Sequence, residues 1–132
     1  MAILELVDIR RTFRQAERDL HVLVGASAKL EPGQAVALVG PSGSGKSSLL
    51  HVAGLLERPT AGQVIVGGRD CADLDDGART AMRRSTIGFI YQFHQLLAEF
   101  SARENVMIPQ MIAGKARGIA AERAGELLTL MG

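Results

Sequence analysis

The chain has 132 residues, about the length of one domain, and its charges nearly balance. Its 15 lysines and arginines face 14 aspartates and glutamates, which gives a formal net charge of +1. Without a dense basic stripe, this composition argues against a nucleic-acid partner. The single cysteine, Cys71, cannot form an internal disulfide, and no apolar run approaches the ~20 residues of a membrane-spanning helix. We therefore expect a one-domain protein of a reducing, cytosolic compartment.

The N-terminal part of the chain predicts an antiparallel hairpin. Residues 3–9 alternate loosely between apolar and charged side chains, as a half-exposed strand does. A polar turn over residues 14–19 leads to a second apolar run at 20–24. The turn signal Glu-Pro-Gly-Gln at 31–34 then precedes Ala35–Val39, an apolar run with the length of a buried strand.

Residues 40–47 read Gly-Pro-Ser-Gly-Ser-Gly-Lys-Ser and fit the phosphate-loop pattern G-x-x-x-x-G-K-S/T. The apolar residues that follow recur with the spacing of one buried helix face, at Leu49, Val52, Ala53 and Leu56. A strand, a glycine-rich loop and a helix in this order form the context in which the motif binds a nucleoside triphosphate. The alternative is a glycine-rich turn without a ligand, and the flanking elements argue against it.

The residue types in the loop suit the chemistry of a triphosphate. Gly40, Gly43 and Gly45 carry no side chain that would keep backbone N–H groups away from phosphate oxygens. The following helix adds its unpaired first-turn N–H groups. We expect Lys46 to reach the β- and γ-phosphates and the Ser47 hydroxyl to ligate Mg²⁺. The predicted phosphate-binding set is Gly40, Ser42, Gly43, Ser44, Gly45, Lys46, Ser47 and Ser48, the last through a hydroxyl to the α-phosphate.

Two strands and a helix are predicted after the loop. Val64–Val66 reads as a short strand closed by two glycines, and residues 75–84 read as a helix with an acidic start and a basic end. Residues 86–91 read as another buried strand, and Gln92 stands just beyond its end. In open α/β sheets, ligands bind beyond the strand ends.

Two helices are predicted in the last third of the chain. Residues 101–114 are helical in pattern, with Glu104 in the first turn, although Pro109 must kink this helix or end it early. The last segment predicts a helix whose apolar face needs a partner, formed by Ala120, Ala124, Leu127, Leu128 and Met131.

Several of these features, taken in chain order, resemble the N-terminal half of an ATP-binding-cassette (ABC) ATPase subunit: Phe13, the loop at 40–47, Arg-Pro-Thr-Ala-Gly at 58–62, and Gln92. The stretch 87–100, with Glu-Asn-Val at 104–106 and Pro109 after it, is most similar to the ATPases of bacterial lipoprotein-releasing systems. Related exporters of the macrolide type are similar through the loop but usually differ just after the glutamine. The resemblance covers essentially the whole chain.

The resemblance implies an α/β fold with a partial P-loop NTPase core of the ABC ATPase type. An antiparallel β subdomain and this core would occupy residues 1–92. The Q-loop and the start of a helical subdomain would occupy residues 93–132. The cofactors implied are ATP and Mg²⁺.

The resemblance also assigns roles to individual residues. Phe13 matches the aromatic residue that stacks on adenine, and the alternative is that Phe13 is a core residue of the hairpin. Val22 is also expected among the nucleotide contacts. Gln92 matches the glutamine that approaches Mg²⁺ and the attacking water, and with Lys46 it forms the expected catalytic pair. An ordinary polar residue at a strand end is the alternative for Gln92. The segment Phe93–Phe100 matches the surface that receives the membrane-embedded permease, and simple core packing is its alternative.

The function implied is ATP binding and hydrolysis coupled to release of lipoproteins, at the cytoplasmic face of the bacterial inner membrane. Two copies of the subunit would sandwich two ATP molecules. The 132 residues contain no L-S-G-G-Q-like signature, no apolar run ending in Asp-Glu, and no switch histidine. We therefore expect negligible hydrolysis by this chain alone. The alternatives are an exporter of the macrolide type, a soluble P-loop kinase, and a nucleotide-binding module without a transport role.

Overall fold

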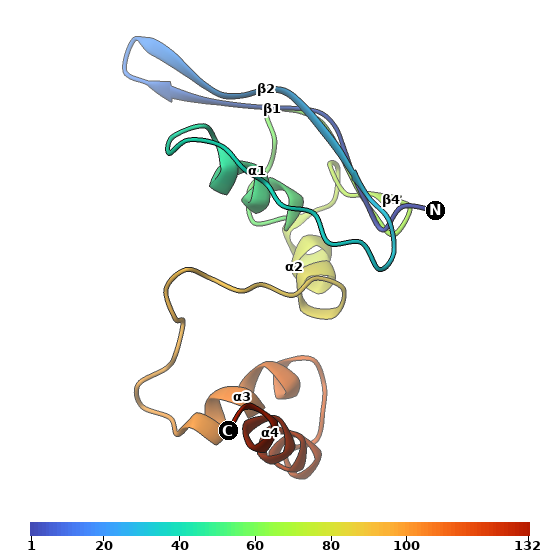
Figure 1. Ribbon diagram of the computed structural model, residues 1–132, viewed down its shortest axis with the longest axis vertical. Coiled ribbons are helices and arrows are strands. Elements are labelled where there is room, and N and C mark those ends of the chain that lie inside the picture. The colour runs from blue at the N-terminus through green and yellow to red at the C-terminus, as the bar shows by residue number, and fades with distance from the viewer. The chain divides into compact units, whose positions relative to one another are not determined.

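The computed structural model describes residues 1–132, which divide into two compact units, Met1–Thr80 and Ala81–Gly132 (Figure 1). The first unit contains the β-sheet and the phosphate loop, and the second contains a pair of helices. The division at residue 92 that the resemblance implies follows the subdomains of the family, and it stays a prediction.

A four-stranded antiparallel sheet forms the frame of the first unit, in the order β2-β1-β3-β4. Its strands are β1 (Leu4–Gln15), β2 (Arg18–Leu30), β3 (Ala61–Val66) and β4 (Arg69–Asp70). The predicted hairpin is confirmed, and its strands extend well beyond the apolar runs that indicated it (Figure 1). The strand predicted at 64–66 is confirmed as the end of β3. Gly67 and Gly68 then turn the chain into β4.

Helix α1 (Lys46–Ala53) begins directly at the phosphate loop and contacts β1 and β2. It ends earlier than the apolar spacing predicted. Gly54 follows the helix, and Leu55 takes a positive φ of 62°, so that Leu55 is fully buried and Leu56 stays exposed. The core of this unit is formed by Ala2, Leu6, Ile9, Leu23, Val52, Leu55, Val64, Val66 and Cys71.

The two buried strands predicted at 35–39 and 86–91 do not form, and this corrects the sequence-based expectation. A strand is stabilised by ladder hydrogen bonds to a neighbour and by cover on its faces. No strand within residues 1–132 pairs with either segment. Val36 and Val39 are accordingly 62% and 84% exposed, and Ile90 is fully exposed.

Helix α2 (Asp76–Ser85) carries the chain from the first unit into the second and confirms the helix predicted at 75–84. Its position after β4 is fixed in part by Arg58, whose guanidinium donates to the carbonyl of Leu74 at 2.8 Å and to Asp76 at 3.1 Å. An acidic first residue and two arginines in the last turn complement the helix dipole.

The second unit contains α3 (Ala102–Ile112) and α4 (Arg117–Met131), as predicted. A capping box begins α3: the Ser101 hydroxyl accepts from the Glu104 N–H at 3.1 Å, and the Glu104 carboxylate accepts from the Ser101 N–H at 3.1 Å. The bond from the Ser101 N–H to the carboxylate is the largest cause of a pKa of Glu104 below its ordinary value, and the Ser101 side chain beside the carboxylate lowers it further. Pro109 does not end the helix, which continues to Ile112.

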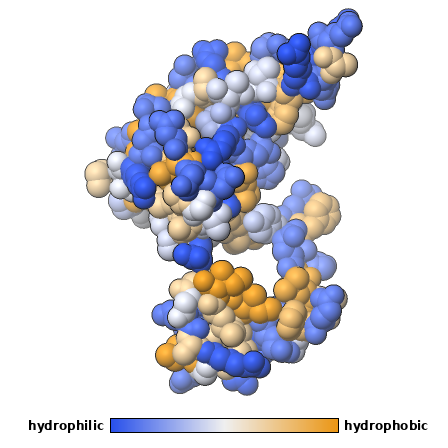
Figure 2. Space-filling view, turned by 180° about the vertical axis from the view of Figure 1, so that it is seen from behind, coloured by the Kyte–Doolittle hydropathy of each residue, from blue (hydrophilic) through white to orange (hydrophobic).

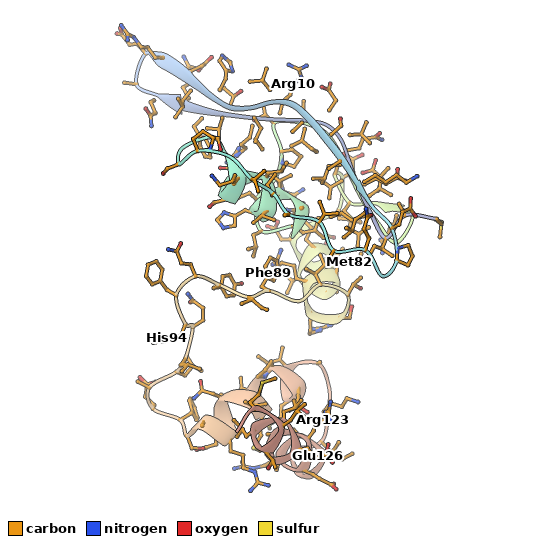
Figure 3. The ribbon with its side chains drawn as sticks, viewed as in Figure 1. Arg10, Met82, Phe89, His94, Arg123 and Glu126 are labelled. Carbon is orange, nitrogen blue, oxygen red and sulfur yellow. The ribbon has the colours of Figure 1, made fainter.

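The two helices pack through Met107 of α3 and Ala120 and Ala124 of α4, all buried. The predicted apolar face of α4 is therefore covered at its N-terminal end. Towards the C-terminus the cover is lost, because Leu127 and Leu128 are only half-buried and Met131 is 81% exposed. Figure 2 shows apolar surface over this helical unit. Arg123 and Glu126 of α4, both labelled in Figure 3, form an ion pair of 2.9 Å.

Candidate nucleotide-binding site

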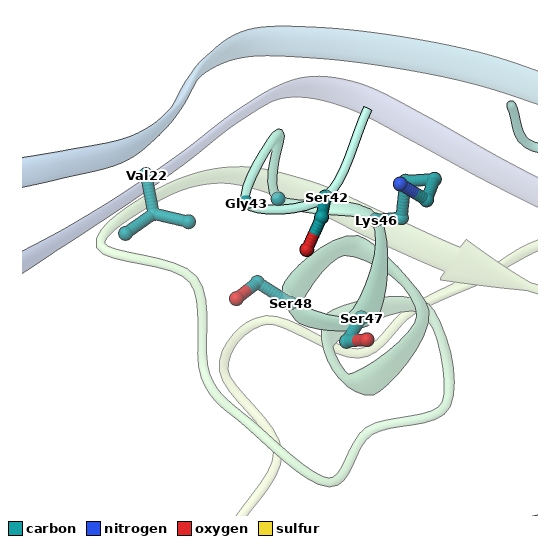
Figure 4. A pocket seen from close by; sticks show the side chains of 7 residues that line it. Val22, Ser42, Gly43, Lys46, Ser47 and Ser48 are labelled. Atoms are coloured by element: carbon teal, nitrogen blue, oxygen red, sulfur yellow. The ribbon is translucent and has the colours of Figure 1, made fainter. Parts of the chain in front are cut away.

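A cavity of about 460 Å³ opens at the phosphate loop, in the size range of small-ligand sites (Figure 4). It lies between Val22 of β2 and the residues of the loop and the first turn of α1. Its lining consists of Val22, Ser42, Gly43, Gly45, Lys46, Ser47 and Ser48. The structure therefore brings together Val22 and most of the predicted phosphate-binding set, while Gly40 and Ser44 lie in the same loop outside this lining.

Glycine is required at position 45 for two separate reasons. Its φ of 96° lies in the left-handed region, which side chains other than glycine rarely adopt. A Cβ atom there would also lie 3.0 Å from the Val22 carbonyl oxygen and 3.1 Å from Leu23 Cδ2. The loop thus lies too close to β2 to leave ordinary space for a side chain at this position. Gly43 has a φ of 80° with open space around it, so at that position only the backbone conformation calls for glycine.

The N-terminus of α1 faces this cavity without a side-chain cap. Its N-cap is Gly45, no side chain accepts from its first N–H groups, and its first turn holds no acidic residue. The first-turn N–H groups and the positive end of the helix dipole are therefore available to an anion. Ser47 and Ser48 add two hydroxyls to the same lining. An arrangement of this kind binds phosphate oxygens.

The Lys46 ammonium is turned back onto its own loop. Its Nζ donates to the carbonyl oxygens of Gly40 at 2.6 Å and Pro41 at 2.8 Å, and it lies 3.5 Å from the Ser44 hydroxyl. In Figure 4 it lies across the loop from Val22. The loop carbonyls thus hold the Lys46 ammonium, the only cation that lines the cavity, at the phosphate loop. No carboxylate is among the lining residues.

Of the three site residues inferred from the resemblance, Val22 lines the cavity, whereas Phe13 and Gln92 lie outside its lining. Phe13 is half-buried on β1, opposite Leu20 of β2, and its role as an adenine contact stays a prediction. Gln92 belongs to the second unit, where its side chain is exposed, and its role towards Mg²⁺ and water also stays a prediction. In the adjoining segment, Phe93 and Leu96 are 74% and 65% exposed, so they do not pack into a core within residues 1–132.

Sequence reasoning missed one group of charged residues in the first unit. Arg11 of β1 forms an ion pair with Glu57, and Glu57 also lies within 3.4 Å of His51 on α1. Arg11 and Glu57 are far apart in the chain, and neither belongs to a motif. No signal in a single sequence indicates such a pair.

The fold and the loop together define a nucleotide-binding P-loop domain. A family model described as "ABC transporter" matches residues 23–132, and the chain belongs to this family. No helix of the chain combines the length and the apolar character that crossing a membrane requires.

Among curated relatives, the chain is 61% identical over 130 residues to the lipoprotein-releasing system ATP-binding protein LolD of Maricaulis maris. It is 54% identical over 131 residues to LolD 1 of Rhodospirillum rubrum. These alignments cover 98% and 99% of the chain but only 57% and 58% of the relatives. The chain therefore spans somewhat more than half the length of the relatives it matches.

A solved structure of the ATP-binding cassette MJ0796, a dimer bound to ADP and Pi, is similar to the chain, with a TM-score of 0.89 and 32% identity. The match covers 96% of this chain and 56% of that one. The ABC ATPase fold expected from the resemblance is thus confirmed over the part that the chain represents.

Proposed function

We propose that the chain is the triphosphate-holding part of an ABC transporter subunit that couples ATP binding and hydrolysis to lipoprotein release. The nucleotide role is supported by one observation: Gly45 brings an uncapped helix N-terminus and Lys46 to one cavity. We call the phosphate loop at 40–47 and the first turn of α1 together the cradle. The proposed cargo is supported by the names of the relatives, which are ATP-binding proteins of lipoprotein-releasing systems.

Within this proposal, the chain's own residues bind and orient the triphosphate. Lys46 exchanges its bonds to the loop carbonyls for bonds to the β- and γ-phosphates, and the first-turn N–H groups of α1 bind the remaining oxygens. The Ser47 hydroxyl would hold Mg²⁺, and the bound ion would supply positive charge at the phosphates. Gln92 orients the attacking water as a neutral amide.

The partners we propose are a second copy of the subunit and a membrane-embedded permease. MJ0796 is dimeric in its solved structures, which supports the first. The exposed apolar side chains of Phe93–Phe100 support the second, because an apolar surface on a loop is suited to binding a partner. The subunit would then lie peripherally at the cytoplasmic face of the inner membrane.

Co-purification with a membrane subunit, followed by a lipoprotein-release assay in proteoliposomes, tests this proposal. We expect the Lys46→Ala subunit to assemble with the permease but to fail in ATP-dependent release. Lys115→Ala, which removes an exposed lysine between α3 and α4, is the matched control and should release normally. Purification without any membrane subunit would contradict the transport role and favour a cassette protein that does not transport.

A further inference from the structure

The guanidinium of Arg11 lies directly over the ring of Phe13, with 4.1 Å between Arg11 Cζ and the ring centroid. This distance is well within the range of a cation–π contact. The two residues lie on the same strand, two positions apart, so their side chains share one face of β1. Arg11 thus covers one face of an aromatic ring that is itself only half-buried.

Arg11 is held over the ring by a carboxylate from another part of the unit. Its Nε lies 3.5 Å from Oε2 of Glu57. Both atoms are shielded from water, although each side chain as a whole remains about a quarter to a third exposed, at 26% and 30%. An ion pair whose facing atoms exclude water is screened less than a surface pair. Neither of these two atoms makes a hydrogen bond, so the attraction between Arg11 and Glu57 is electrostatic.

Glu57 is in turn fixed by the last turn of α1. Its N–H donates to the His51 carbonyl oxygen at 3.2 Å, and its Oε1 lies 3.4 Å from His51 Nδ1. Helix α1 begins at Lys46, so one short helix connects the phosphate cradle to the carboxylate that holds Arg11. The position of the Phe13 ring is therefore tied to the same element that positions the phosphates.

We propose that Arg11, held by Glu57, is a positioning residue for the nucleobase: it fixes the Phe13 ring and covers one face, leaving the opposite face to stack on adenine. This inference rests on the proposed function. A cation on one face draws electron density from the ring, which favours stacking of an electron-rich base on the other. Holding the ring in place before binding also removes part of the ordering cost of binding.

The inference predicts an effect on the base and none on the phosphates. We would measure the affinities of the chain for ATP and for tripolyphosphate, both with Mg²⁺, by isothermal titration calorimetry. Arg11→Gln and Glu57→Gln should each weaken ATP binding roughly two- to fivefold, the range of a partly exposed cation–π contact. Tripolyphosphate has no base, so its affinity should not change.

Two further variants sharpen this test. Arg10→Gln is the matched control, because Arg10 pairs with Asp8 at 3.2 Å at the exposed surface of the same strand and should leave both affinities unchanged (Figure 3). In a Phe13→Ala background, Arg11→Gln should have no further effect on ATP, because the residue it positions is gone.

Several outcomes would contradict the inference. If both glutamine variants weaken the binding of ATP and of tripolyphosphate equally, the Arg11–Glu57 pair has only a structural role. Tighter ATP binding by Arg11→Gln would mean that Arg11 occupies the face that the base needs. If Arg11→Gln does not fold, Glu57→Gln makes the same comparison. If the unchanged chain binds neither ligand, the proposed function fails and this inference fails with it. If Phe13→Ala binds ATP as tightly as the wild type, Phe13 does not contact the base. The inference then fails, while the proposed phosphate site is unaffected.

Discussion

Replacing Gly45 by alanine should destabilise the first unit more than the same replacement at Gly33 or Gly43. Three glycines of the first unit allow a comparison, because Gly33, Gly43 and Gly45 have φ values of 76°, 80° and 96°. Only at Gly45 would the new methyl group meet other atoms within 4 Å. The three substitutions therefore share a conformational penalty and differ in steric contact.

The expected magnitudes follow from these two contributions. A left-handed conformation costs a residue with a side chain about 1–2 kcal/mol, and this applies at all three sites. At Gly45 the methyl group also lies 3.0 Å from a backbone carbonyl oxygen and 3.1 Å from a buried leucine, so that β2 or the loop must shift. Such overpacking costs about 1–3 kcal/mol more. Gly45→Ala should therefore destabilise the first unit by about 2–5 kcal/mol in total.

Urea unfolding followed by circular dichroism measures this difference, and tripolyphosphate titration reports the cradle. We expect Gly33→Ala to lower stability modestly and to leave phosphate binding intact. Gly45→Ala should lower stability further and abolish binding. If Gly45→Ala costs no more than Gly33→Ala, the close approach of the loop to β2 is not present in solution, and our explanation for this glycine is wrong.

Three further predictions concern the second unit and the chain as a whole. In a complete transporter, Phe93→Ala and Leu97→Ala should uncouple lipoprotein release from ATP hydrolysis at near-normal hydrolysis rates. Normal release by both variants would contradict a coupling role for these residues. The lowered pKa of Glu104 contributes stability that is present above the ordinary glutamate pKa and is lost as the pH falls through the lowered pKa. The thermal melting temperatures of the wild type and Glu104→Gln should therefore converge as the pH falls below the ordinary glutamate pKa, and a difference that stays constant with pH would contradict the capping box. The chain alone should hydrolyse ATP negligibly and should associate through the exposed end of α4, and turnover near the ~1 to 10³ s⁻¹ of typical enzymes would contradict this.

Local sequence signals predicted those elements whose stability depends on nearby residues. The hairpin strands pair with each other across a short turn, and the helix at 76–85 carries its own complementary charges at both ends. The capping box of α3 lies within four residues, Ser101–Glu104, and the phosphate loop is a continuous motif. Each of these features depends on interactions that are short in sequence.

The features that the sequence did not predict depend on distant or missing neighbours. The apolar runs at 35–39 and 86–91 have strand composition, but strands form only beside a partner, and none exists within residues 1–132. The end of α1 was misjudged because the left-handed turn at Leu55, rather than the helical period, decides which leucine is buried. The Arg11–Glu57 pair joins two elements that only the fold brings together.

The central claim, that this chain holds a triphosphate in the loop at 40–47, is tested most directly by calorimetric titration of Mg-ATP into the wild type and Lys46→Ala. A hydrogen bond to a charged group contributes about 1.5–3 kcal/mol, so loss of the ammonium should weaken ATP binding by roughly tenfold or more. Lys115→Ala should bind as the wild type does. Equal affinity of the wild type and Lys46→Ala for ATP would contradict the account.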